Sequence, residues 1–275
     1  QKKISIVAST SIWADVAQAV ADTASGVDIE VKPIVEGNGV DPHHFEPSAA
    51  DIARAEDADV LVVNGGGYDS WIYQAVSEQD NIISALPLTD HGKLADDPSV
   101  VTIDAAKATA KKDPKKVTNI EGNEHIWYDP AALDEVAGNI ADQINELNTD
   151  ANASTERVDS HVDRLRDKLK ELPGDLSYAQ TEPIADYIMK YTSGKDVTPE
   201  GYRKATISEG EPTAADLAAR CHRAAIEGRW ATTMRFYAGP TLLVIDELGY
   251  LPLPAEAASA LFQVVSQRYL KTSIV

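Results

Sequence analysis

Cysteine is nearly absent from this chain of 275 residues, which contains Cys221 and no other. A single thiol excludes an internal disulfide bond and a metal cluster built on several cysteines. Long apolar runs are absent as well, since none approaches the roughly 20 residues that a membrane-spanning helix needs. The chain opens at Gln1 with neither an initiator Met nor the apolar core of a signal peptide, so we expect a mature or trimmed start.

Positive charge is also scarce. The sequence has 25 Lys and Arg side chains against 44 Asp and Glu side chains, which gives a formal net charge of −19. Such a surface repels phosphate backbones and anionic lipid, so we expect no nucleic-acid partner and no membrane-binding face, whereas a cation suits it as a ligand. The other proportions, 43% hydrophobic and 25% charged residues, are typical of a soluble globular protein, and the length predicts about two domains.

Strand and helix patterns alternate along the chain. The runs expected to form strands are Lys3–Ala8, Val27–Val35, Asp59–Asn64, Asp175–Gln180, Thr241–Ile245 and Thr272–Val275. The segments expected to form helices are Ile12–Ala24 with Ser11 as N-cap, Ser48–Glu56, Tyr68–Ser77, Ala131–Leu147, Ala151–Leu172, Pro183–Thr192, Thr213–Ile226 with Thr213 as N-cap, and Pro254–Tyr269. Repeated β–turn–α units predict the α/β class, with mainly parallel sheets covered by helices.

The helix expected at Ala151–Leu172 has a regular apolar spacing. Its apolar side chains follow one another at intervals of four, three, four and three residues, at Val158, Val162, Leu165, Leu169 and Leu172. That spacing places them on one stripe, and a helix of this length runs roughly 30 Å. We therefore expect two α/β lobes joined by one long rigid helix, with residues 1–150 in the first lobe, 151–172 in the helix and 173–275 in the second lobe.

Three short motifs carry candidate metal ligands. They are DPHHFEP at Asp41–Pro47 with His43 and His44, NEHIWYDP at Asn123–Pro130 with His125, and QTEP at Gln180–Pro183 with Glu182. All three fall in strand-to-helix loops, at the edge where open α/β sheets bind ligands. Neutral imidazole together with carboxylate suits Zn, Mn or Fe. Taken alone, a single histidine is more often structural than a ligand, and the spacing leaves open whether the three motifs meet.

Several segments in the first four-fifths of the chain match one family in order and spacing. They are TSI at Thr10–Ile12, DPHHFEP at Asp41–Pro47, the strand and NGGG turn at Asp59–Gly67, HIWYDP at His125–Pro130, TEPIADYI at Thr181–Ile188 and EGEPTAADLA at Glu209–Ala218. With these segments the sequence resembles the metal-binding solute-binding proteins of ABC transporters, the class of ZnuA-like and TroA-like proteins. The resemblance implies that His43, His125 and Glu182 bind a divalent transition metal, Zn or Mn, and that His44 is a neighbour.

The resemblance also implies a cellular role. Proteins of this class hold the metal between two lobes, outside the cytoplasm, either in the periplasm or as a lipoprotein at the cell surface. They pass the metal to an ABC permease in the membrane and are not enzymes. We expect the same of this chain, and we expect it to be a monomer.

The last part of the chain departs from the family. The usual fourth ligand, an aspartate after the last strand of the second lobe, has no counterpart here. From about Arg220 onward the sequence instead resembles the IstB-like helper ATPases of insertion-sequence transposition, and Thr241–Val275 matches their segment with the acidic Walker B pair, here Asp246 and Glu247. Residues 220–275 carry a net charge of +2, which leaves −21 on residues 1–219. We therefore expect a chimeric chain, formed by fusion of two reading frames.

The foreign segment offers a strand, a helix and a second strand. We expect these elements to complete the sheet of the second lobe, because a parallel sheet accepts any buried apolar strand with a covering helix. Two arrangements at the metal stay open. Either Asp246 or Glu247 supplies a fourth ligand, or water completes a site of three protein ligands with reduced affinity.

Three other functions are weaker interpretations. A transposition ATPase needs a Gly-rich loop that ends in Gly-Lys-Ser/Thr, whereas the two Gly-Lys pairs, which begin at Gly92 and Gly194, are followed by Leu94 and Asp196. A metal-dependent hydrolase would use the same two histidines, carboxylate and water, but neither an HExxH motif nor a recognisable general base accompanies them. The third alternative is a fusion remnant that folds and no longer transports.

Overall fold

The computed structural model describes residues 3–37, 40, 42–78, 80–100, 102–103, 119–180, 183–198, 214–245, 255–268 and 272–274. The chain divides into two compact units, Gln1–Lys170 and Glu171–Val275. Within the described residues no helix is both long and apolar enough to cross a membrane.

The first unit is built on a four-stranded parallel sheet with the order β2-β1-β3-β4. Its strands are β1 (Ile4–Thr10), β2 (Ile29–Val35), β3 (Val60–Val63) and β4 (Ile82–Ser84). The register pairs Ile4 with Ile29 and Leu61 with Ile82. Two short strands, β5 (Thr102–Ile103) and β6 (Asn119–Ile120), pair separately. Parallel pairing brings the carboxyl ends of β1, β2 and β3 to one edge of the main sheet.

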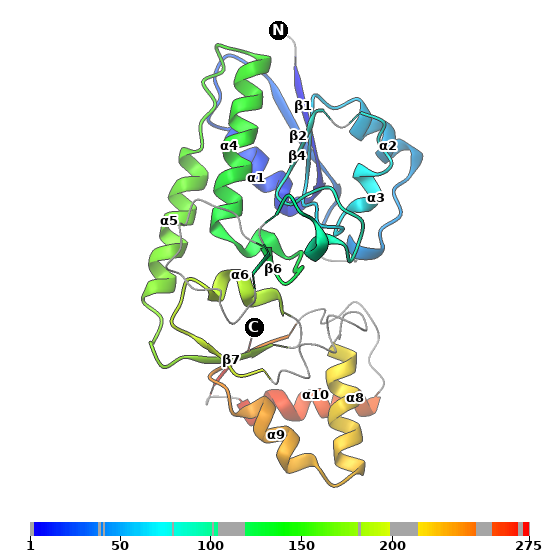
Figure 1. Cartoon of the computed structure of the whole chain (residues 1–275), viewed down its shortest axis with the longest axis vertical. Coiled ribbons are helices and arrows are strands. Elements are labelled where there is room, and N and C mark those ends of the chain that lie inside the picture. Colours follow the sequence, from blue (N-terminus) through cyan, green and yellow to red (C-terminus); the bar gives the residue numbers. More distant parts are fainter. Residues whose placement is uncertain are drawn as a thin grey trace. The chain divides into compact units, whose positions relative to one another are not determined.

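Helices cover both faces of this sheet (Figure 1). One face carries α1 (Ser11–Ala21), α4 (Pro130–Leu147) and α5 (Glu156–Lys170), and the other carries α2 (Ala49–Glu56) and α3 (Ser70–Tyr73). Val7 and Leu61 belong to the apolar cluster under α2 and α3. Because successive side chains of a strand point to opposite faces, both faces of these strands are buried. The continuous apolar run of β3 and the apolar residues 6–8 of β1 follow from this double burial.

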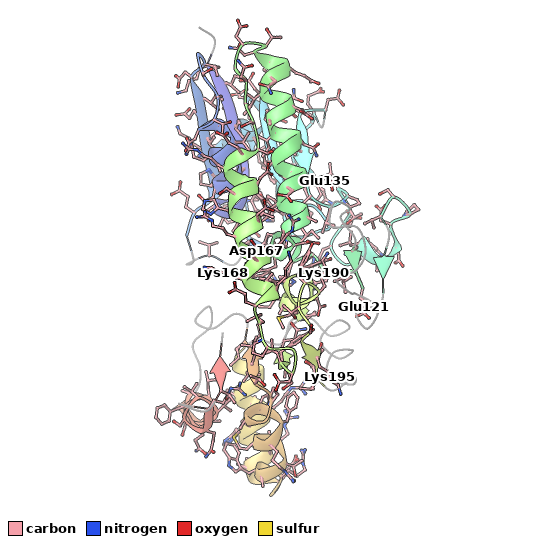
Figure 2. All side chains as sticks on the ribbon, turned by 90° about the vertical axis from the view of Figure 1, so that its left-hand side faces the viewer. Glu121, Glu135, Asp167, Lys168, Lys190 and Lys195 are labelled. Atoms are coloured by element: carbon pink, nitrogen blue, oxygen red, sulfur yellow. The ribbon has the colours of Figure 1, made fainter. Side chains whose placement is uncertain are left out.

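The helix expected at 151–172 is observed as α5, which begins at Glu156 and ends at Lys170, inside the first unit. Its stripe buries Val158, Val162 and Leu169, whereas Leu172 lies beyond the helix and is 40% exposed. Arg166 binds Asp134 of α4 at 2.9 Å. Figure 2 shows these two helices, with the side chain of Glu135 labelled on α4 and those of Asp167 and Lys168 labelled on α5.

The second unit is built on another four-stranded parallel sheet, with the order β10-β9-β7-β8. Its strands are β7 (Ser177–Gln180), β8 (Lys195–Asp196), β9 (Leu242–Val244) and β10 (Ser273–Ile274). The register pairs Tyr178 with Leu242 and Gln180 with Val244. The prediction that the C-terminal segment supplies strands to this sheet is confirmed by these pairings, and β9 lies in the interior of the sheet.

The two faces of this second sheet have different covers. Tyr178 and Val244 pack under the 3-10 turn Pro183–Ala185 and α6 (Asp186–Met189). Ala179 and Leu243 pack under three helices, which are α8 (Ala214–Ile226), α9 (Trp230–Ala238) and α10 (Ala255–Arg268). The C-terminal segment therefore supplies one of the two interior strands, β9, and most of the cover on one face.

Several local predictions differ from the structure. The N-cap of α1 is Thr10 rather than Ser11, and α3 is a single turn inside the predicted 68–77 helix. The helix predicted at 183–192 is the 3-10 turn followed by the short α6. Strands β4 and β8 and helix α9 have no counterpart among the predictions. The N-cap predicted at Thr213 lies outside the described residues.

Candidate metal centre

The turn after β3 forms the base of the candidate site. Asn64 ends the strand run, and three glycines with positive φ follow it, at +77°, +67° and +91° for Gly65, Gly66 and Gly67. A Cβ atom on Gly65 would lie 2.1 Å from the carbonyl oxygen of Leu86. Only glycine accepts both that backbone conformation and that approach, so the NGGG motif sets the shape of this turn.

Asp69 closes the turn from inside. Its fully buried carboxylate accepts hydrogen bonds from the Ser9 hydroxyl at 2.5 Å and from the backbone amides of Asn64 at 2.7 Å and Gly65 at 3.0 Å. Burial raises the pKa of Asp69 to about 6, although the three donors oppose that shift. Ser9 lies near the end of β1, so Asp69 ties two neighbouring strand ends together.

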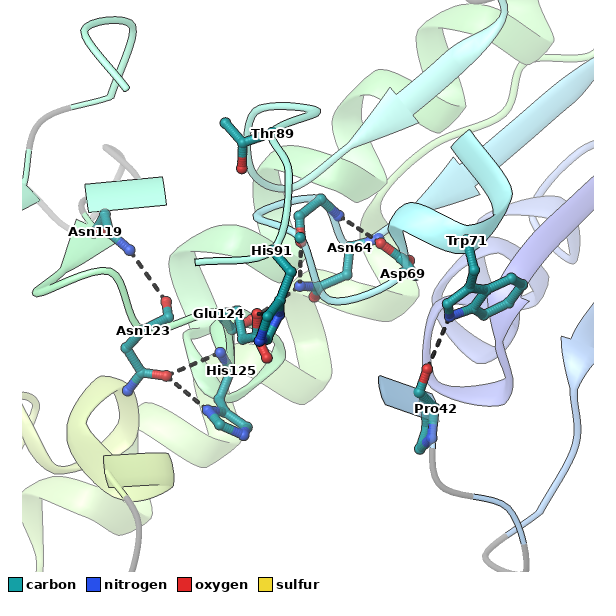
Figure 3. A network of polar contacts seen from close by, with 12 residues as sticks. Pro42, Asn64, Asp69, Trp71, Thr89, His91, Asn119, Asn123, Glu124 and His125 are labelled. Atoms are coloured by element: carbon teal, nitrogen blue, oxygen red, sulfur yellow. Dashed lines mark hydrogen bonds and ion pairs between the residues drawn. The ribbon is translucent and has the colours of Figure 1, made fainter. Parts of the chain in front are cut away.

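The Asn64 side chain connects this turn to the second histidine motif (Figure 3). Its amide oxygen accepts a hydrogen bond from the Trp13 indole at 3.2 Å. Its amide nitrogen donates to the carbonyls of Gly65 at 3.1 Å and Glu124 at 2.9 Å. The segment around Glu124 is therefore held at the carboxyl edge of the sheet, next to the end of β3.

His125 is buried, with 5% of its surface exposed, directly before the 3-10 turn Ile126–Tyr128. The side-chain oxygen of Asn123 lies 3.0 Å from the backbone nitrogen of His125 and 2.7 Å from its ring Nδ1. A backbone N–H is always a donor, so the Asn123 atom that receives it is the oxygen, and Nδ1 must then carry the ring proton. With the ring neutral, its lone pair would therefore lie on Nε2, one of the two ring nitrogens through which histidine binds metal ions.

The first histidine motif lies on the same edge of the sheet. Pro42–His44 forms a 3-10 turn in the loop after β2. The Trp71 indole of α3 donates a hydrogen bond to the Pro42 carbonyl at 2.8 Å (Figure 3). The Trp71 ring packs edge-on against Phe45, with 4.8 Å between the ring centroids. The side chain of His43 lies outside the described residues, and that of His44 is exposed.

The remaining candidate ligands lie in parts of the chain that the structure does not describe. These are Glu182 from the third motif and Asp246 and Glu247 from the C-terminal segment. Among the side chains that are described, no three His, Cys, Asp or Glu residues form a metal-binding group. The structure thus places the backbones of the two histidine motifs at one sheet edge and describes one candidate ligand side chain, that of His125.

Three supporting residues were not identified by the sequence reasoning. Asn123, Asn64 and Trp71 hold the two histidine motifs, yet none of them has a titratable side chain that would mark it as a candidate. Asn123 stands two residues before His125 in the motif, which is the only local signal. For Asn64 the signal is its position between a buried strand and a glycine triplet.

Residues 6–226 match the family profile described as zinc-uptake complex component A, periplasmic. Residues 211–275 match a second profile, the IstB-like ATP-binding protein, so the two matches overlap at 211–226. Helix α8 lies entirely inside this overlap, and β9, α10 and β10 belong to the second match alone.

Individual proteins follow the same division. The metal ABC transporter substrate-binding lipoprotein SsaB of Streptococcus sanguinis is 26% identical over 223 residues, 77% of this chain and 65% of its own length. The ATP-binding protein of insertion sequence IS5376 from Geobacillus stearothermophilus is 38% identical over 82 residues, 30% of this chain and 31% of its own length. The chain therefore spans less than two thirds of each of these relatives.

Solved structures match the whole chain in fold. A Mn-bound mutant of a periplasmic metal-binding protein from Candidatus Liberibacter asiaticus superimposes with a TM-score of 0.55 at 16% identity, over 99% of this chain and 88% of that one. Because this match extends over 99% of the chain, the C-terminal segment takes part in the common α/β fold even though its sequence matches a different family.

Proposed function

Since the chain belongs to the zinc-uptake component A family of ABC-transporter substrate-binding proteins, we propose that it captures a divalent transition metal outside the cytoplasm for delivery to an ABC permease. The family consists of binding receptors and not of enzymes. The observation that carries the proposal is the 2.7 Å contact between the ring Nδ1 of the buried His125 and the side-chain oxygen of Asn123, which fits a neutral ring with its lone pair on Nε2. A buried imidazole held in that tautomer is pre-formed for a metal ion.

The proposed ligands are His43, His125 and Glu182. The hydrogen bonds at Pro42 and Glu124 support the first two, because they hold both histidine motifs at the edge where α/β sheets bind ligands. Glu182 follows β7 by two residues, the equivalent position in the second sheet. Two imidazoles and a carboxylate suit Mn, Zn or Fe, and we propose Mn or Zn as the cargo. The net charge of −21 on residues 1–219 raises the local concentration of any such cation.

We infer that the site is weaker than that of an unfused family member. The chain has an IstB-like sequence where the family provides its fourth ligand, so Asp246, Glu247 or water must complete the coordination. An open fourth position is typical of catalytic metal sites rather than of storage or capture. If Asp246 is the ligand, Asp246→Ala should lower the affinity for both Zn²⁺ and Mn²⁺ in a calorimetric titration, whereas an unchanged affinity would assign the position to Glu247 or water.

Metal content tests the proposal directly. Purified wild type, His43→Ala and His125→Ala would be stripped, loaded with Zn²⁺ or Mn²⁺, desalted and analysed for bound metal. His161→Ala is the matched control, since His161 is an exposed residue of α5 whose Nδ1 lies 2.8 Å from Arg164. We expect about one metal per chain in wild type and control and a marked loss in both site variants. Equal metal content in all four proteins would overturn the proposal.

A further inference from the structure

Two carbonyl groups next to the proposed ligands receive side-chain hydrogen bonds from one short segment. The Trp71 indole donates to the carbonyl of Pro42 at 2.8 Å, and the Asn64 amide donates to the carbonyl of Glu124 at 2.9 Å. Pro42 immediately precedes His43, and Glu124 immediately precedes His125. The two donors are seven residues apart, one at the end of β3 and the other in α3.

A hydrogen bond to these carbonyls acts directly on the ligand residue. The carbonyl of one residue and the N and Cα atoms of the next lie in a single peptide plane. Fixing the Pro42 oxygen therefore orients the plane that ends at the Cα of His43, and fixing the Glu124 oxygen does the same for His125. Metal–ligand distances tolerate only about 0.2 Å of error, so the direction of these planes matters for binding.

The segment that carries both donors is itself held firmly. The Asp69 carboxylate accepts hydrogen bonds from the backbone amides of Asn64 and Gly65, and it also binds Ser9 of β1. The Asn64 side chain is further fixed by Trp13, and the Trp71 ring packs against Phe45. Both donors are therefore held in place, and each hydrogen-bonds to the peptide plane that precedes one of the two histidines (Figure 3).

We propose that Trp71 and Asn64 are positioning residues that orient His43 and His125, respectively, for the metal. This inference rests on the proposed function, because it assumes that both histidines bind the ion. It assigns the β3–α3 segment a role in metal affinity although neither residue supplies a ligand atom. Each donor acts on its own histidine: Trp71 on His43, and Asn64 on His125.

The test is a Zn²⁺ titration of Trp71→Phe, which keeps an aromatic ring against Phe45 and removes the N–H donor. We expect its affinity to fall about three- to tenfold, the value of one hydrogen bond. Asn64→Ala is a second variant with the same expected direction. Asn81→Ala is the matched control, because the Asn81 amide donates to the Ala58 carbonyl at 2.8 Å, just before β4 and away from the carboxyl edge. It should leave Zn²⁺ affinity unchanged.

Double variants separate positioning from general destabilisation. In a His43→Ala background Trp71→Phe should have no further effect on Zn²⁺ affinity, whereas in a His125→Ala background it should still lower affinity by the same factor. An equal effect in both backgrounds, or none in the wild type, overturns the inference. If His43→Ala and His125→Ala themselves leave affinity unchanged, the proposed function fails instead. If Asn64→Ala does not fold, Trp71→Phe in the wild type and in the two histidine backgrounds still tests the inference.

Discussion

The side-chain oxygen of Asn123 accepts two hydrogen bonds from His125, one from its backbone N–H at 3.0 Å and one from its ring Nδ1 at 2.7 Å. The first bond identifies the oxygen, and the second fixes the ring tautomer and the ring orientation. A partner of this kind raises the basicity of a ligating imidazole and holds it in place.

Removing this acceptor should weaken metal binding without removing a ligand. We expect Asn123→Ala to lower Zn²⁺ affinity about 10- to 100-fold, the usual cost of losing the partner of a ligating histidine. Asn123→Asp keeps the acceptor and should retain affinity. Asn145→Ala is the control, since Asn145 also makes two hydrogen bonds to one residue, Ala153, in the same unit. Competition with a chelator would measure the Zn²⁺ affinity of the wild type and the three variants. Equal affinities in all four proteins would contradict the assigned tautomer.

Asp69 should make the stability of the first unit depend on pH. Burial raises its pKa to about 6 from an ordinary value of 3.8, so between these pH values the folded protein holds a proton that the unfolded chain has released. The free energy of unfolding should therefore fall as pH rises from about 4 to about 6, by at most about 3 kcal/mol, and then level off. Asp69→Asn cannot ionise and should lose this slope, which urea titrations from pH 4 to 7 would measure.

Ser9→Ala provides the matched comparison for that experiment. The Ser9 hydroxyl lowers the pKa of folded Asp69, so its removal should extend the range in which stability falls to higher pH, while the lower limit, set by the unfolded chain, stays the same. A slope shared by wild type and Asp69→Asn would mean that another group causes it.

Arg268 should be essential for the second sheet. The residue is 1% exposed, and its guanidinium donates to the carbonyls of Tyr237 at 2.6 Å, Pro240 at 3.0 Å and Thr241 at 3.2 Å, where α9 leads into β9. We expect Arg268→Ala to destabilise the unit by about 2–4 kcal/mol, because it leaves buried acceptors without this donor and opens a cavity. Hydrogen exchange of the amides in 230–245 measures the effect.

Arg235→Ala is the control for Arg268, because the exposed Arg235 approaches a threonine hydroxyl at the long distance of 3.5 Å. It should change stability by no more than about 0.5 kcal/mol. Faster exchange in both variants alike would show that the effect is one of charge and not of the three carbonyl contacts.

The sequence predicts the main strands and long helices of the fold, because they carry strong apolar patterns. β3 reads as an unbroken run of four buried residues, and α4 has an N-cap in Asp129 followed by Pro130 at its first position. Elements of two or three residues, such as β4 and β8, are too short for a period to be visible. Helix α9 has two threonines and three aromatic residues in nine positions, a composition with weak helix propensity.

The candidate site was predictable as a set of residue types and not as a geometry. His125 is identified by its motif, but its tautomer depends on the conformation of the Asn123 side chain, which no sequence pattern encodes. The link between Trp71 and Pro42 joins residues 29 positions apart through a tertiary contact. Such contacts arise only when the strands have been placed in order, so single-sequence reasoning cannot reach them.

The pairing of β9 with β7 has a consequence for how genes survive rearrangement. Backbone amides and carbonyls are chemically the same in every protein. A strand from another protein can therefore pair in a sheet if it has the right length, direction and apolar side chains. A mobile element that encodes an α/β ATPase carries such strands with helices attached. An insertion of such an element can therefore leave a foldable product behind.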